Sequence, residues 1–148
     1  MTFKAKIDQD MLVAAKGKDK LTLSALRLIK AALHNREIDL KRELNDSEFL
    51  QVLSGMVKQR RDSIEQFAKG GRTDLVEKEE AEMKIIQAFM PQPLSQEEML
   101  QEIRQAVNET GALTVKDMGR VMKALMPKLT GRVDGKLLSD RVKALLSA

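Results

Sequence analysis

Residues 89–98 read Phe-Met-Pro-Gln-Pro-Leu-Ser-Gln-Glu-Glu, and this stretch decides how the chain is organised. Neither Pro91 nor Pro93 can continue a helix, because proline lacks a backbone N–H and biases the residue before it toward an extended conformation. Ser95 then stands three residues before Glu98, which is the spacing of a capping box at the start of a new helix. The stretch therefore predicts two domains, residues 1–93 and residues 94–148.

Upstream of the prolines, the pattern predicts four helices. Apolar residues recur at spacings of three or four, while Tyr, Trp and alternating apolar runs, which would indicate strands, are missing. Asn45 or Asp46 caps the third helix, with Glu48 placed to complete a capping box if Asn45 is the cap, and Gly70-Gly71 ends it. The first helix is expected over residues 3–16, the second begins between 19 and 22, and the fourth covers residues 74–89.

Downstream of the prolines, the pattern predicts three shorter helices. The first of them runs from the Ser95 cap to Gly111, and Thr114-x-x-Asp117 opens the next, which Pro127 ends or bends. Glycines then frame a turn before the last helix. Because each group of helices carries an apolar stripe to bury, we expect an all-α fold, with an N-terminal bundle of about four helices followed by a C-terminal three-helix bundle.

Composition excludes several classes of protein. The 148 residues include no cysteine and a single histidine, His34, so disulfide frameworks, thiol nucleophiles and zinc sites built on thiolate or imidazole are not expected. No apolar run approaches the roughly 20 residues that a membrane-spanning helix needs. The first residues carry frequent charges and lack the apolar core of a signal peptide. We predict a cytoplasmic protein without a cofactor.

One charged group falls on apolar faces and allows two interpretations. Arg60 lies on the apolar stripe of the third helix, and Glu79 and Glu82 continue the stripe of the fourth. The carboxylates could form a general acid–base pair or a divalent-cation site. Alternatively, they pair with Arg60 and Arg61 in a charged layer across the bundle, or lie on a solvated face. We favour the structural interpretation, because no nucleophile or oxyanion donor lies nearby, and we predict no catalytic, cofactor-binding or metal-binding residue.

The end of the chain is basic. Residues 112–148 contain eight cations and three anions, an excess larger than the +4 of the whole chain. Backbone N–H groups near Gly135 could add anion-binding donors. The plain alternative is that these cations only keep a small helical domain soluble. The predicted phosphate-contacting residues are Lys116, Arg120, Lys123, Lys128, Arg132 and Lys136.

All four phenylalanines precede the prolines, so this basic region has no aromatic ring to stack on a base. If it binds RNA, we expect binding through phosphates and shape.

Several separated motifs resemble a known family. Residues 119–123 (Gly-Arg-Val-Met-Lys), 131–137 (Gly-Arg-Val-Asp-Gly-Lys-Leu) and 142–146 are similar to the tail signature of the GatB/YqeY family. Residues 57–67 and 89–95 resemble the stand-alone YqeY proteins in particular. The similarity covers nearly the whole chain, with the motifs in the family's order and spacing.

The resemblance implies an all-helical fold whose tail is similar to the end of the B subunit of the glutamine-dependent tRNA amidotransferase. In that enzyme the tail contacts tRNA, and a separate, larger domain performs catalysis. Family descriptions extend carbon–nitrogen ligase activity, with glutamine as amido donor, to YqeY-like proteins. The resemblance thus implies a tRNA-binding accessory module of translation that is not catalytic alone. Its implied partners are tRNA and the amidotransferase or aminoacyl-tRNA synthetase machinery, with no membrane or DNA.

Two other function classes stay open. The chain is alternatively a helical protein–protein interaction adaptor without RNA binding, whose N-terminal bundle presents an exposed apolar or methionine-rich patch. The third reading is an enzyme that acts through Arg60, Glu79 and Glu82.

Overall fold

The computed structural model describes residues 2–147, and every regular element within that range is helical. This confirms the all-α fold class. In chain order the elements are α1 (Phe3–Lys16), α2 (Lys20–Leu40), α3 (Asp46–Lys69), α4 (Thr73–Gln87), α5 (Gln96–Thr110), the 3-10 turn η1 (Val115–Asp117), α6 (Met118–Leu129) and α7 (Gly135–Ser147).

Side-chain caps start the first two helices. The Thr2 hydroxyl accepts from the Ala5 N–H at 3.1 Å. The Asp19 carboxylate accepts from both the backbone N–H and the hydroxyl of Thr22, at 3.1 and 2.6 Å. These bonds satisfy N–H groups that have no partner inside the helix.

The two predicted capping boxes are confirmed. At α3 the Asn45 side chain accepts from the Glu48 N–H at 2.9 Å, and the Glu48 carboxylate accepts from the Asn45 N–H at 3.1 Å. The same reciprocal pair joins Ser95 and Glu98 at α5, at 3.1 and 3.3 Å. The residue that follows α5, Gly111, has φ of +68°, which glycine adopts without strain.

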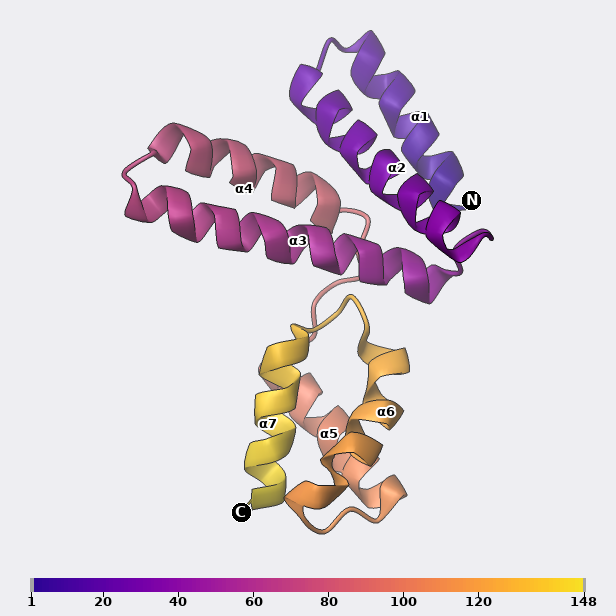
Figure 1. The fold of residues 1–148 in the computed structure, drawn as a ribbon, viewed down its shortest axis with the longest axis vertical. Helices are drawn as coiled ribbons and strands as arrows, with labels where there is room; N and C mark the ends of the chain where they lie inside the picture. Colours follow the sequence, from indigo (N-terminus) through magenta and orange to yellow (C-terminus); the bar gives the residue numbers. More distant parts are fainter. Residues whose placement is uncertain (1, 148) are drawn as a thin grey trace. The chain divides into compact units, whose positions relative to one another are not determined.

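The helices gather into two compact units, which we call the N-terminal unit (Met1–Met90) and the C-terminal unit (Pro91–Ala148). Within the N-terminal unit, α1 lies along α2 and α3 along α4 (Figure 1). Its core includes the fully buried Leu26, Ile29, Leu53 and Ile86.

In the C-terminal unit, α6 packs against both α5 and α7. The core of this unit includes the fully buried Ile103, Val121, Leu125, Leu138 and Val142.

Pro127 does not end α6, which continues to Leu129. Proline in the last turn removes only the bond that its own N–H would donate to the carbonyl four residues earlier, and the helix ends two residues later. Thr130 closes the end, because both its N–H and its hydroxyl donate to the Met126 carbonyl. Across residues 2–147, no helix has both the length and the apolar character to cross a membrane.

Candidate nucleic-acid interface

The six predicted phosphate-contacting residues are distributed along α6 and its flanks. Lys116 lies in η1, and Arg120, Lys123 and Lys128 lie on α6. Arg132 follows in the α6–α7 connection, and Lys136 begins α7. On α6 itself, Arg120 and Lys128 are eight residues apart, which corresponds to about 12 Å along the axis at a rise of about 1.5 Å per residue.

The four lysines of this set share one property. Each is exposed, and none forms an ion pair with any other side chain of residues 2–147. An exposed ammonium without a carboxylate partner is available to an external anion. These residues, which we call the free lysines, are Lys116, Lys123, Lys128 and Lys136.

Arg120 has a partner within the fold. Its guanidinium donates to the Asp117 carboxylate at 2.7 Å and to the Thr110 carbonyl at 3.1 Å. The same carboxylate accepts from the N–H groups of Leu113 and Thr114, at 2.9 and 3.2 Å. These backbone bonds and the Arg120 bond lower the pKa of Asp117 to about 2. Arg120 therefore fixes the loop between α5 and α6, although 59% of its side chain is exposed.

Arg132 also has a structural role. Its Nε donates to the Gln92 carbonyl at 3.3 Å, and its own carbonyl accepts from the Leu94 N–H at 3.0 Å. These two bonds hold the proline segment against the α6–α7 connection. The side chain is half-buried, unlike those of the free lysines.

The start of α7 is already occupied by a carboxylate. Asp134 accepts from the Lys136 N–H at 3.1 Å. A negative side chain at a helix N-terminus satisfies the donors that a phosphate would use. Asp134 therefore occupies one of the amides near Gly135 and competes with an external anion there, and anion binding by the other amides stays a prediction.

Arg60 and Glu82 form a buried ion pair across α3 and α4. Their nearest N and O atoms are 3.4 Å apart, and only 11% and 8% of the two side chains are exposed. The guanidinium also donates to the Met56 carbonyl, while its Nε is buried without a partner. Glu79 is half-buried and Arg61 exposed, and neither forms an ion pair within residues 2–147. Of the two interpretations, the geometry matches the charged layer, reduced to a single pair.

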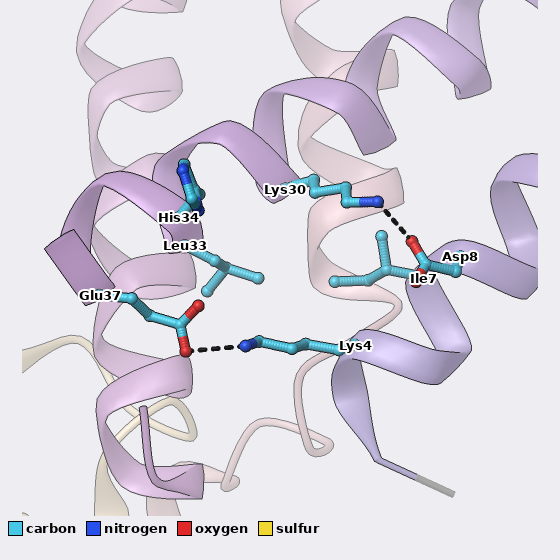
Figure 2. Close-up of a pocket in the computed structure, with 7 residues that line it drawn as sticks. All are labelled: Lys4, Ile7, Asp8, Lys30, Leu33, His34 and Glu37. Carbon is cyan, nitrogen blue, oxygen red and sulfur yellow. Dashed lines mark hydrogen bonds and ion pairs between the residues drawn. The ribbon is translucent and has the colours of Figure 1, made fainter. Parts of the chain in front are cut away.

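A small groove between α1 and α2 contains the only histidine (Figure 2). Lys4 bonds Glu37 and Lys30 bonds Asp8, both at 2.8 Å, and these pairs cross the groove near the floor residue Leu33. The Lys4 bond, followed by the Leu44 N–H, lowers the pKa of Glu37. The groove measures about 150 Å³, and its lining includes no hydroxyl or thiol that His34 could activate.

No group of three or more His, Asp or Glu side chains within residues 2–147 is arranged to hold a metal ion. The predicted charged residues therefore fall into three kinds: free lysines, arginines that hold loops, and one buried pair.

Sequence reasoning missed one exposed feature of this surface. Leu113 is 84% exposed and Val115 is 38% exposed, both in the loop that Asp117 fixes. The spacing gave no signal of this exposure, because a leucine directly before a helix start such as Thr114-x-x-Asp117 usually packs against the helix.

Comparison with known proteins gives a family match and fungal relatives. Residues 4–146 match the family described as Yqey-like protein. The relatives are named "Altered inheritance of mitochondria protein 41, mitochondrial". The protein of Eremothecium gossypii is 40% identical over 87 residues, which are 58% of this chain and 48% of that protein. That of Kluyveromyces lactis is 30% identical over 142 residues, 95% of this chain and 74% of its own length. That of Saccharomyces cerevisiae (strain YJM789) is 33% identical over 137 residues, which are 90% of this chain and 71% of that protein.

The match spans about half the length of the Eremothecium relative. All three relatives are named as mitochondrial proteins, and this contradicts the cytoplasmic location predicted from the sequence. The prediction depended on a composition without cysteine, and the absence of thiols does not distinguish one reducing compartment from another.

Proposed function

This chain belongs to the family of Yqey-like proteins, and we propose that it is a tRNA-binding accessory protein that performs no catalysis by itself. The observation that carries the proposal is the set of free lysines on and beside α6. Each could release counterions from an RNA backbone on binding, and this release provides most of the affinity of basic surfaces for nucleic acids.

The form of the surface favours a folded RNA as the ligand. The free lysines come from three consecutive elements, η1, α6 and α7, and the two on α6, Lys123 and Lys128, are about 7.5 Å apart along the helix axis. Such a set suits contacts to more than one phosphate. All four phenylalanines lie in the N-terminal unit, so no aromatic ring is present here to stack on single-stranded bases. Shape and backbone are then the features that this surface would recognise.

The resemblance of residues 119–146 to the amidotransferase B-subunit tail supports tRNA as the RNA. In this proposal the chain positions tRNA for the amidotransferase or aminoacyl-tRNA synthetase machinery, and the carbon–nitrogen bond is made by the partner. Leaving catalysis to the partner fits the chain's own residues, since Arg60 and Glu82, the most buried charged groups described, pair with each other.

A filter-binding titration with a tRNA transcript at two salt concentrations tests the proposal. Affinity should fall steeply with salt, and Lys123→Gln/Lys128→Gln should lower the slope of log affinity against log salt by about two. Arg132 is left intact because it holds Gln92. The matched control is Lys58→Gln/Lys78→Gln, two exposed lysines of the N-terminal unit that also have no ion pair within residues 2–147. Absence of binding at low salt would refute the proposal.

The second candidate, a protein-interaction adaptor, is favoured by an apolar groove in the N-terminal unit. The groove measures about 500 Å³ and is lined by Val13, Ile85 and Phe89 among others, with Val13 64% exposed. Such a surface suits an apolar segment of another protein. If this candidate is right, a partner captured by the chain should survive nuclease treatment and be lost from Val13→Asp, while Lys123→Gln/Lys128→Gln still captures it.

A further inference from the structure

Three helix starts in this chain have the same sequence arrangement. In each, a leucine directly precedes a capping residue that is followed three positions later by Glu or Asp. In this arrangement the leucine usually packs against the fourth helical residue and fixes how the chain enters the helix. The three leucines are Leu44 before α3, Leu94 before α5 and Leu113 before η1.

Only two of the three leucines pack in this way. Leu44 is half-buried against the core that contains Phe49, and Leu94 is half-buried against the core that contains Met99. Leu113 is 84% exposed, although Met118, its expected neighbour, packs against the core of the C-terminal unit. The chain therefore has an apolar side chain at a position where such side chains usually pack, and here it is exposed to solvent.

The loop that carries Leu113 is held firmly. Asp117 accepts from the Leu113 and Thr114 N–H groups and from Arg120, which also binds the Thr110 carbonyl. On the other side of Leu113, Ala112 is buried in the core. An exposed leucine on a fixed backbone loses little conformational freedom when a ligand covers it, and this lowers the entropic cost of binding.

The charge around Leu113 selects the type of ligand. Lys116 lies three residues further on, exposed and without an ion pair within residues 2–147. Residues 109–129 contain two anions: Glu109, which accepts from the Gln105 amide, and Asp117, whose charge three donors already compensate. A ligand that fits has an apolar face with negative charge beside it. In RNA, an unstacked base or the end of a base stack provides such a face, and the phosphates provide the charge.

We propose that Leu113, together with the 38% exposed Val115, packs on a base face presented by folded RNA while Lys116 contacts an adjacent phosphate. The proposal rests on the proposed function. The Leu113 contact adds an apolar interaction to a surface that would otherwise recognise only the charge of the phosphates. The protein would then bind RNAs that expose a base more tightly than uninterrupted duplex.

The test compares Leu113→Ala with the wild type on two RNAs, a folded tRNA transcript and a long fully paired duplex. With tRNA, Leu113→Ala should weaken binding about tenfold and leave the salt slope unchanged, because the lost contact involves no counterion. With the duplex, whose base faces are stacked, the variant and the wild type should bind equally. The control is Leu100→Ala, a leucine of α5 that is 37% exposed and lies outside the predicted phosphate-contacting set.

The outcomes distinguish a failure of this base contact from a failure of the proposed tRNA-binding function. If the wild type binds no tRNA at low salt, the proposed function fails. If the wild type binds with a steep salt slope but Leu113→Ala binds tRNA as tightly, the RNA function stands and the base contact is wrong. A Leu113→Ala variant that loses tRNA and duplex equally would also overturn the base contact. Unchanged circular dichroism and melting temperature in the variant confirm that the fold is intact, as expected for so exposed a side chain.

Discussion

The two units use their charged side chains differently. Among residues 2–147, every ion pair but one lies in the N-terminal unit, where pairs join α1 to α2 and α3 to α4. In the C-terminal unit the one pair, Arg120–Asp117, fixes a loop, and none of the five lysines forms an ion pair within residues 2–147. The N-terminal unit also has exposed lysines without an ion pair in that range, such as Lys58 and Lys78, so the units differ in how many charges are paired and in the excess of eight cations over three anions in residues 112–148. In the proposed function, this excess of cations binds the ligand, while the pairs of the N-terminal unit stabilise its fold.

The largest expected effect is on the buried pair of the N-terminal unit. Glu82→Ala leaves the Arg60 guanidinium buried without a counter-charge, and we expect the free energy of unfolding to fall by about 3 kcal/mol. Urea denaturation measures it. Glu80→Ala, which removes an exposed carboxylate of the same helix, is the control and should stay within about 0.5 kcal/mol. Equal effects of the two substitutions would show that the pair is not structural.

Separating the two units tests whether the structural and binding roles are divided between them. We predict that fragments 1–90 and 91–148 each fold alone, since each contains its own buried cluster and the second keeps the bond from Arg132 to Gln92. In the proposed function, tRNA affinity stays with fragment 91–148 and is about a hundredfold weaker in fragment 1–90. Circular dichroism checks folding, and filter binding checks affinity. Comparable affinity of both fragments would contradict the division of roles.

The packed and unpacked leucines predict a third difference. Leu94→Ala should lower the stability of the C-terminal unit by about 1–2 kcal/mol, because Leu94 packs against the buried core. Leu113→Ala should change this stability by less than about 0.5 kcal/mol, because Leu113 is 84% exposed and makes little contact with the core. Thermal unfolding of fragment 91–148 or of the whole chain measures both. If Leu113→Ala were the more damaging, the exposed position of Leu113 would be wrong.

Local chemistry explains what the sequence could predict here. The capping boxes at Asn45 and Ser95 need only residues three positions apart, and the apolar periodicity places the core residues on one face of each helix. The same locality explains what was missed. Whether Leu113 packs depends on how the chain approaches η1, and the bond from Arg132 to Gln92 joins residues 40 positions apart. Such features depend on tertiary geometry, which spacing does not encode.

The site was predictable to a similar degree. Sequence alone collected the basic residues of the last quarter of the chain, and their role in binding stays a prediction. It could not separate the free lysines from Arg120 and Arg132, because that distinction depends on which carbonyl or carboxylate each arginine reaches.

Acid should affect the N-terminal unit through several carboxylates with a lowered pKa, Glu37 and Glu48 among them, and the C-terminal unit through Asp117. The Arg42 bond lowers the pKa of Glu48 to about 2, and the backbone N–H of Leu113 does the same for Asp117. A lowered pKa in the folded state means that the stabilisation is complete above about pH 5 and is lost as the pH falls toward 2. Asp117→Asn should therefore lose less stability between about pH 5 and pH 2 than the wild type. An unchanged acid dependence would remove Asp117 from this role.

The smallest effect is expected at the groove between α1 and α2. Lys30 and Asp8 are 2.8 Å apart but more than half exposed, so solvent screens their attraction (Figure 2). Lys30→Ala should lower the free energy of unfolding by less than about 0.5 kcal/mol, and 1 M salt should remove the difference. A double-mutant cycle with Asp8→Ala isolates the pair from other effects of the two substitutions. A coupling above about 1 kcal/mol would mean that even exposed pairs of the N-terminal unit are structural, and would strengthen the contrast with the free lysines.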